Sequence, residues 1–421
     1  MQRLRYSFSY LKVSLSTFKI SKLQKTLLIS LFIVPILAVA VFSIFAIRNL
    51  NDRILEDIDF LIYHMEESFP FFGVIERRLE IDLREELLEL RRSVSAQKLA
   101  MSERNFYLLL RETFSELNSA AHLAIIRPDD RANIEERNNF YAQDGLSPPP
   151  SSTLDSTEII LSGGAVVSTS IIEKDKIAYL LISNMTYMQT ISEWENLRRF
   201  LLEVRDYEHL IIDIRPTRGG HQGEFLRYLV APNLSEDNPL NFYSFAFFNE
   251  GELAEQVAEY HIRRTRGNFH HASFWGSEIL EAKELVEKFN LIHINKDDLE
   301  GLAYGYKIRT SVPHFDRDVR FNGKIWLLTS SINGSASEAF ARLSKEAGFT
   351  LVGETTGAAI GGGGTAHFRL PNTKIGIRLD TLYITDDTGR AKEEFPTEPH
   401  YHISPGEDAL DVTLELIRQG R

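Results

Sequence analysis

A serine in the C-terminal third of the chain stands in a context that suits a catalytic nucleophile. Ser335 follows Gly334, between an apolar segment over 323–330 and a helix-forming segment. A glycine before the serine permits a tight, strained turn at little steric cost. The start of the next helix would offer a free N–H, that of Ala336, to a developing oxyanion. The alternative is that Ser335 or Ser337 only caps this helix.

The elements around this serine alternate between strand-like and helix-like patterns. The predicted strands lie at 171–183, 209–216, 323–330, 349–357 and 374–385, and the predicted helices at 192–207, 335–348 and 406–420. Such alternation predicts an α/β core with a largely parallel sheet.

Two further regions are predicted to be helical. Apolar residues recur every three or four positions over 53–72, 83–100 and 103–117, with Ser102 as an N-cap, which predicts a helical domain over 48–121. Residues 122–421 form the predicted core, with an insertion at about 233–318 that contains charged helices over 252–267 and 277–290. This insertion either covers a cleft or is a solvated decoration.

The N-terminus reads as a membrane anchor. Residues 26–47 contain no charged side chain, and about 20 helical residues cross a bilayer core. Residues 1–25 carry six Lys and Arg and no acid, so they are expected in the cytoplasm, with everything after Arg48 outside the cell. A signal peptide cleaved near Ala38-Val39-Ala40 is the rival, but the apolar run is longer than a signal sequence needs. A buried core helix is disfavoured because the run is apolar on every face.

Composition excludes several functions. The net charge of −12, with the cations of 1–25 set apart, argues against a nucleic-acid partner. Without cysteine, the chain has neither disulfides nor a thiolate nucleophile. No H-E-x-x-H motif occurs, so neither a metal nor another cofactor is expected. Residues 143–153, rich in Pro and Ser, are predicted to form a turn-rich linker or an exposed loop.

Five segments in order, Ser335 among them, resemble the C-terminal-processing and tricorn-like serine peptidases, over about Asp59 to Gln419. The family serine stands three residues before a glutamate, as Ser335 stands before Glu338. The segment SELNSAAHLAI resembles the family segment that supplies the general base, which implies this role for His122.

The resemblance implies further site residues on glycine-rich segments. The strand LIIDIRPTRGG resembles the family strand whose glycines supply an oxyanion N–H, so Gly219 and Gly220 join Ala336 as expected donors. The segment LVGETTG and the glycine run after it imply that Gly357, Gly361 and Gly362 approach the bound peptide.

The chain end resembles the family's Gly-x-x-x-Glu-x-x-Gly-x-x-Pro-Asp ending. The family glutamate that orients the histidine is expected at Glu394. The departures are Ala120-Ala121 in place of Asp-Gly, Thr217 in place of Asn, and an ending without its Gly and Asp. Between Lys345 and Lys374 there is no lysine for the family's Ser–Lys branch, so the Ser–His branch is expected. The short stretch after His122 leaves no room for a PDZ domain.

The resemblance implies a Clp-protease/crotonase-like α/β core behind an N-terminal helical bundle and a transmembrane helix. The expected function is a single-pass, tail-specific serine endopeptidase at the cell membrane, with its catalytic domain extracellular. Ser335 would be the nucleophile, His122 the general base and Glu394 the orienting carboxylate, acting on a peptide or protein substrate. The alternative is an inactive relative that binds peptides at the cell envelope. The oligomeric state and the substrate stay open.

Overall fold

The protein is described here from a computed structural model. It describes residues 50–97, 99–117, 120–127, 166–185, 191–220, 222–234, 240–265, 273–276, 278–312, 316–358 and 365–421. Within these ranges, no helix is both long enough and apolar enough to cross a bilayer. The expected anchor over 26–47, the basic segment over 1–25 and the linker over 143–153 lie outside the described residues.

Helices build the N-terminal region, as predicted. They are a helix over 50–68, α3 (Phe72–Leu79), α4 (Leu83–Ser95) and α5 (Glu103–Thr113), followed by the 3-10 turns η1 (Ser115–Leu117) and η2 (Ala120–His122). The Ser102 side chain accepts a hydrogen bond from the backbone N–H of Asn105, so the predicted N-cap of α5 is confirmed. The described part of the first helix buries Ile54, Ile58, Leu61 and Met65, one stripe at helical spacing.

Six strands form the main sheet of the core, in the order β14-β10-β9-β4-β3-β2. They are β2 (Val167–Glu173), β3 (Ile177–Ile182), β4 (His209–Asp213), β9 (Lys324–Thr329), β10 (Thr350–Gly353) and β14 (Tyr401–His402). Every pair is parallel except the β2–β3 hairpin, which confirms the predicted α/β core. The central strands β4 and β9 are buried almost throughout, since helices cover both faces.

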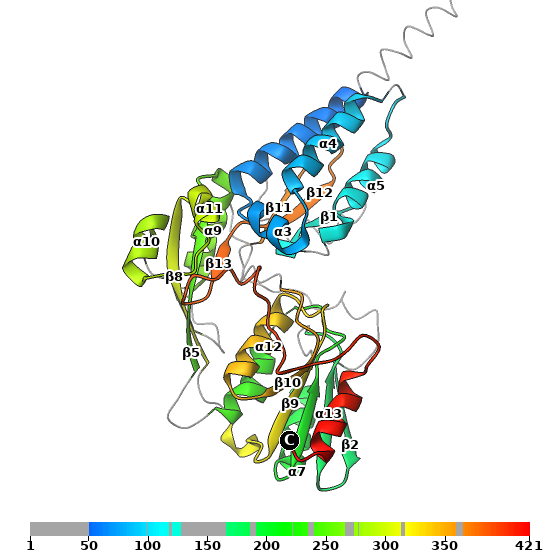
Figure 1. The fold of residues 1–421 in the computed structure, drawn as a ribbon, viewed down its shortest axis with the longest axis vertical. Helices are drawn as coiled ribbons and strands as arrows, with labels where there is room; N and C mark the ends of the chain where they lie inside the picture. The colour runs from blue at the N-terminus through cyan, green and yellow to red at the C-terminus, as the bar shows by residue number, and fades with distance from the viewer. Residues whose placement is uncertain are drawn as a thin grey trace, which may run out of the picture.

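Helices pack on both faces of this sheet (Figure 1). One face carries α7 (Ile191–Val204), α12 (Ala336–Glu346) and the short turns α8 (Gly223–Phe225), η4 (Leu226–Val230) and η5 (Ala231–Asn233). The other face carries the C-terminal helix α13 (Ala409–Arg418). Because β4 and β9 are parallel neighbours, the loops after their carboxyl ends meet at one edge of the sheet.

Two smaller sheets lie toward the N-terminal helices (Figure 1). One has three antiparallel strands, in the order β1 (Ala124–Ile126), β12 (Gly376–Asp380) and β11 (Thr365–Arg369). The other runs β13-β5-β8-β6, with β5 (Leu240–Phe248), β6 (Ser273–Gly276), β7 (Leu280–Glu281), β8 (Tyr304–Val312) and β13 (Tyr383–Thr385). Its helices are α9 (Glu252–Thr265), α10 (Ala282–Phe289) and α11 (Lys296–Gly301), and the turn η6 (Arg317–Val319) leads back to the core.

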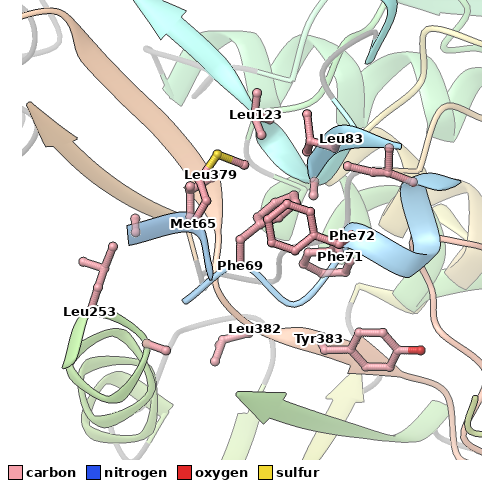
Figure 2. Packing of buried hydrophobic residues seen from close by; sticks show 14 of the residues in the cluster. Met65, Phe69, Phe71, Phe72, Leu83, Leu123, Leu253, Leu379, Leu382 and Tyr383 are labelled. Carbon is pink, nitrogen blue, oxygen red and sulfur yellow. The ribbon is translucent and has the colours of Figure 1, made fainter. Parts of the chain in front are cut away.

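The insertion and the N-terminal helices share one hydrophobic core. Figure 2 shows Met65 and Phe69 packed with Leu379 of β12, Tyr383 of β13 and Leu253 of α9, all buried. The insertion is therefore continuous with the helical region and is more than a solvated decoration.

The segment predicted as one strand over 374–385 is two strands in different sheets. β12 ends at Asp380 and β13 begins at Tyr383. Thr381 and Leu382 between them are both buried. The chain thus turns from the three-stranded sheet into the insertion sheet, and this turn leaves Asp380 at the end of β12.

Candidate active site

The turn between β9 and α12 has the strained geometry expected of a nucleophile. Ser335 has φ 55° and ψ −119°, in a region that non-glycine residues rarely adopt. Its side chain makes no capping hydrogen bond, although it stands in the N-cap position of α12. Its N–H donates to the carbonyl of Ala358 at 2.9 Å, which fixes the backbone. Strain of this kind costs about 1–3 kcal/mol and persists only where the surroundings enforce it.

Ser337, the other serine that could cap the helix, is structural. It is fully buried, and its hydroxyl lies 2.8 Å from the carbonyl of Gly334 and 3.1 Å from that of Thr217. The Asn333 amide also donates to the carbonyl of Thr217, at 2.8 Å. These contacts hold the turn against the loop that follows β4.

The glycine loop after β4 lies directly beside the serine. Gly219 and Gly220 have φ 119° and 134°, which L side chains rarely adopt. A Cβ at Gly219 would lie 2.9 Å from the Cβ of Ser335 and 2.7 Å from the carbonyl oxygen of Gly334. Only glycine fits this approach, so the loop and the start of α12 at Ala336 meet at Ser335, where their N–H groups could receive an oxyanion.

His122 is held by a carboxylate from the three-stranded sheet. It ends η2 with φ 53°, directly after Ala121 at φ 47°. Its Nδ1 lies 2.7 Å from Oδ2 of Asp380, and Oδ1 of Asp380 accepts a hydrogen bond from the Thr365 hydroxyl at 2.7 Å. Burial opposes the charge on Asp380, but His122, Thr365 and Arg378 outweigh burial and lower its pKa. An ionised Asp380 fixes the His122 tautomer, with Nε2 left to act as the base.

The carboxylate expected beside His122, Glu394, lies elsewhere. Both its oxygens accept hydrogen bonds from Arg77, each at 2.8 Å, and Arg77 also pairs with Asp298 of α11 at 2.6 Å. The carboxylate that lies beside His122 is therefore Asp380. No spacing rule links Asp380 with His122, because 258 residues separate them.

Glu393, the neighbour of Glu394, is a site residue that the sequence assignment missed. Its Oε1 accepts hydrogen bonds from the backbone N–H of Ala121 and from Nη1 of Arg78, both at 3.0 Å. Burial raises the pKa of Glu393 to about 7, although Arg78 favours the ionised form. The expected Gly-x-x-x-Glu spacing, counted from Gly389, does fall on Glu393, so the signal was present.

Arg78 of α3 connects the histidine turn with the nucleophile turn. Nη1 of Arg78 binds Glu393, and Nη2 donates to the carbonyl of Gly357 at 3.1 Å. The Gly357 N–H donates in turn to the carbonyl of Asn333 at 2.8 Å. Both backbone groups of Gly357 are thus engaged by the protein. Gly361 and Gly362, also expected to bind substrate, lie outside the described residues.

Within the described parts of the chain, no hydrogen bond joins His122 to Ser335. The structure brings Ser335, Gly219, Gly220 and Ala336 together on one side and His122 and Asp380 on the other. Catalytic hydrogen bonds are often long or poorly aligned without substrate and tighten when substrate binds.

A buried carboxylate fastens the nucleophile helix to the C-terminal segment. Glu338 is fully buried and accepts hydrogen bonds from the hydroxyls of Thr356 and Thr397, the latter at 2.7 Å. It also pairs with Arg342 at 3.0 Å. This network fixes the first turn of α12, and Ser335 with it.

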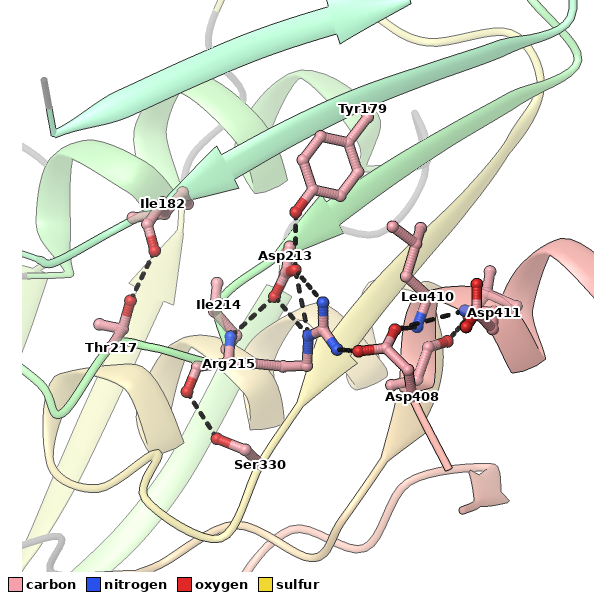
Figure 3. Close-up of polar contacts among 12 residues, drawn as sticks. Tyr179, Ile182, Asp213, Ile214, Arg215, Thr217, Ser330, Asp408, Leu410 and Asp411 are labelled. Carbon is pink, nitrogen blue, oxygen red and sulfur yellow. Dashed lines mark hydrogen bonds and ion pairs between the residues drawn. The ribbon is translucent and has the colours of Figure 1, made fainter. Parts of the chain in front are cut away.

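A second polar network fixes the end of β4 (Figure 3). Asp213 accepts a hydrogen bond from the Tyr179 hydroxyl at 2.7 Å. It also accepts hydrogen bonds from Arg215, the shortest at 2.7 Å. Arg215 also binds Asp408, the N-cap residue of α13, and its carbonyl accepts from the hydroxyl of Ser330 at 2.6 Å. The loops after β4 and β9 are therefore tied to each other and to the last helix.

Solved structures share this fold at low sequence identity. A structure described as a "putative peptidase from Parabacteroides merdae ATCC 43184" superposes with a TM-score of 0.52 at 12% identity, covering 88% of this chain and 96% of its own. Mature CPAF complexed with lactacystin gives a TM-score of 0.53 at 14% identity, covering 84% and 94%. At these identities the likeness shows the fold alone. No curated protein sequence matches the chain.

The sequence pattern of a peptidase family decides the class. The pattern of peptidase family S41 matches residues 176–403, more than half of the chain, and it includes the glycine loop, Ser335, Asp380 and Glu393. This confirms the resemblance to the C-terminal-processing and tricorn-like serine peptidases. The chain belongs to peptidase family S41 and is a serine peptidase.

Proposed function

We propose that the chain is a membrane-anchored endopeptidase that cleaves extended peptides outside the cell, with Ser335, His122 and Asp380 as its catalytic residues. The observation that carries the catalytic assignment is the 2.7 Å contact between His122 Nδ1 and the buried Asp380, because it leaves Nε2 of His122 as the base. The strained, uncapped Ser335 beside Gly219 supplies the nucleophile.

The reaction follows the acyl-enzyme route of serine peptidases. His122 takes the hydroxyl proton of Ser335 while Oγ forms a bond to the scissile carbonyl carbon. The N–H groups of Gly219, Gly220 and Ala336 stabilise the oxyanion. His122 then gives its proton to the leaving amine as the C–N bond breaks, and water attacks the ester by the same steps in reverse. The proposal requires His122 and Ser335 to come within hydrogen-bond distance when the peptide binds.

A fluorophosphonate probe tests the nucleophile. Wild type should be phosphonylated at Ser335, with loss of fluoride, and mass spectrometry should place the label on that residue. Ser335→Ala should abolish labelling, and His122→Gln should slow it by about 10³-fold or more. Ser331→Ala, an exposed serine in the same turn, is the matched control and should label as wild type does.

Two results would contradict the catalytic assignment. Labelling that persists in Ser335→Ala would place the nucleophile elsewhere. An unreactive wild type that still binds peptides would favour a peptide-binding relative, a function that the missing His122–Ser335 hydrogen bond also fits.

The anchor part of the proposal rests on residues 26–47 and on the charges that flank them. The uncharged run between Lys25 and Arg48 is long enough to span a bilayer, and the six cations before it favour a cytoplasmic N-terminus. The full chain should stay with membranes in alkaline carbonate, and protease added to intact cells should degrade the catalytic region. A chain starting at Arg48 should be recovered in the soluble fraction. If residues 26–47 are not an anchor, the full chain and the shorter chain should be recovered in the same fraction.

A further inference from the structure

An arginine that forms no ion pair with the described residues lies on the sheet face that carries the His122–Asp380 pair. Arg378 and Asp380 are two residues apart on β12, so both side chains point to the same face. In the strand register Arg378 stands opposite Ala124 of β1 and His367 of β11. One pleat, about 7 Å along the strand, separates the two positions.

Among the described residues, no carboxylate forms an ion pair with Arg378, although its charge acts on Asp380. Its Nε is buried and has no hydrogen-bond acceptor, and among the described residues its side chain forms no ion pair. Both oxygens of the nearest carboxylate, Asp380, are engaged, one by His122 and one by Thr365. Burial and the Arg378 charge lower the pKa of His367 to about 4, so the imidazole opposite is neutral and supplies no negative charge.

Other arginines that are partly covered do have carboxylate partners. Arg77, Arg78, Arg215 and Arg342 each lie within 3.0 Å of at least one Asp or Glu oxygen. Desolvation lowers the pKa of Arg378 and outweighs the opposing effect of the Asp380 charge. A buried polar group without a partner is uncommon and calls for an explanation, and a binding site for an anion is one.

We infer that Arg378 binds a carboxylate of the peptide substrate and so selects which peptides are cleaved. The residue is half-buried, and Nε is the guanidinium nitrogen that is enclosed without a hydrogen-bond partner. A guanidinium binds a carboxylate through two parallel hydrogen bonds. This role deepens the proposed function and rests on it.

The distance along β12 limits where this carboxylate can lie in the substrate. An extended peptide advances about 3.3 Å per residue, and the arginine side chain adds about two residues of reach to the 7 Å offset. The carboxylate should therefore lie within about four residues of the bond that His122 and Ser335 cleave. It is either the C-terminal carboxylate of a short tail or the side chain of an Asp or Glu.

The test compares matched peptides with and without the carboxylate. Quenched fluorogenic peptides that wild type cleaves are selected from a random-sequence pool and resynthesised with a C-terminal carboxamide, with each Asp or Glu changed to Asn or Gln, or with both changes. Removing the recognised carboxylate should lower kcat/KM of wild type by about 10- to 100-fold, mainly through KM. Arg378→Gln should remove this preference, so that the carboxylate and neutral forms of a peptide are cleaved with the same kcat/KM. Arg378→Lys should retain part of the preference. Which substitution matters identifies the source, a free C-terminus or an acidic side chain.

The inference is overturned if Arg378→Gln lowers cleavage of neutral and carboxylate peptides equally, since that result means a role in folding or in the His122–Asp380 pair. It is also overturned if wild type shows no preference. The same peptides are titrated by fluorescence anisotropy against Ser335→Ala with and without Arg378→Gln. Suppose that wild type cleaves nothing, but Ser335→Ala still binds carboxylate peptides more tightly through Arg378. That result would refute the catalytic assignment and leave the role of Arg378 standing.

Discussion

His122 owes its role to a residue that lies far away in the chain. Asp380 is fully buried, faces His122 at 2.7 Å and is held on its other oxygen by Thr365. The neighbouring candidate Glu394 is bound to Arg77 instead. The orienting carboxylate is thus chosen by strand register, in which β1 and β12 run antiparallel and bring the end of η2 to the end of β12.

Exchanging each carboxylate for its amide separates the two assignments. Asp380→Asn should lower kcat by about 10³- to 10⁴-fold, because the amide disfavours the required His122 tautomer. Glu394→Gln should leave kcat within about threefold, because it weakens only the contact with Arg77. Steady-state kinetics, with thermal unfolding to show that both variants fold, measure the difference. A larger loss of kcat in Glu394→Gln than in Asp380→Asn would identify Glu394 as the orienting carboxylate.

Glu393 should make stability depend on pH. Its pKa rises from 4.5 to about 7 on folding, so the unfolded chain ionises first as pH rises. The stability that the raised pKa of Glu393 contributes is complete below about pH 4.5 and is lost as pH rises through about 7. Over this window the free energy of unfolding of wild type should fall by up to roughly 3 kcal/mol relative to Glu393→Gln, measured by urea denaturation. Parallel curves for the two proteins would contradict the prediction.

At the scale of elements, the site is made where two parallel strands end. The loops after β4 and β9 are locked by Asn333 and Ser337, which leaves Gly219 in contact with the Ser335 turn. The α12 N-terminus then points its free N–H groups at the same place. The catalytic geometry depends on this close approach of two backbones.

Gly219→Ala tests this approach. The new methyl group would meet Ser335 and Gly334, so kcat should fall by about 10²-fold or more as the oxyanion site is displaced. Gly348→Ala is the matched control, because Gly348 also has a positive φ, 93°, but nothing lies near its Cβ position. Both variants should lose similar stability from backbone strain, while only Gly219→Ala loses activity. Equal kinetics for the two would mean that the loop does not border the reacting atoms.

At the scale of the whole molecule, two hydrophobic cores meet at the site. One core joins the N-terminal helices, the insertion and the three-stranded sheet, and the other lies on the six-stranded sheet. His122 and Asp380 are chain neighbours of residues in the first core, and Ser335 precedes Ala336 of the second. Arg78 connects them through Glu393 and Gly357.

Adjacent arginines on α3 give a controlled test of this connection. Arg78→Met leaves Glu393 without its guanidinium and loosens both turns, so kcat/KM should fall by about 10- to 100-fold. Arg77→Met removes contacts to Asp298 and Glu394 and should affect the melting temperature more than kcat. Steady-state kinetics measure kcat/KM of both variants, and calorimetry measures their melting temperatures. A larger kinetic loss in Arg77→Met would mean that the connection runs through the insertion.

Local patterns predicted much of this protein because they reflect local physics. Apolar spacing and caps predicted the helices α4, α5, α12 and α13 and the buried strands β4 and β9. Glycine spacing beside Ser335 predicted the turn, because a positive φ limits the residues that fit.

Tertiary structure alone decided the partner of His122, the surroundings of Arg378 and the shared core of the insertion with the helices. These features depend on strand register and on packing between segments hundreds of residues apart. The sequence by itself determined the class of peptidase and proposed Ser335 as its nucleophile, whereas the carboxylate beside His122 followed only from where the strands come together.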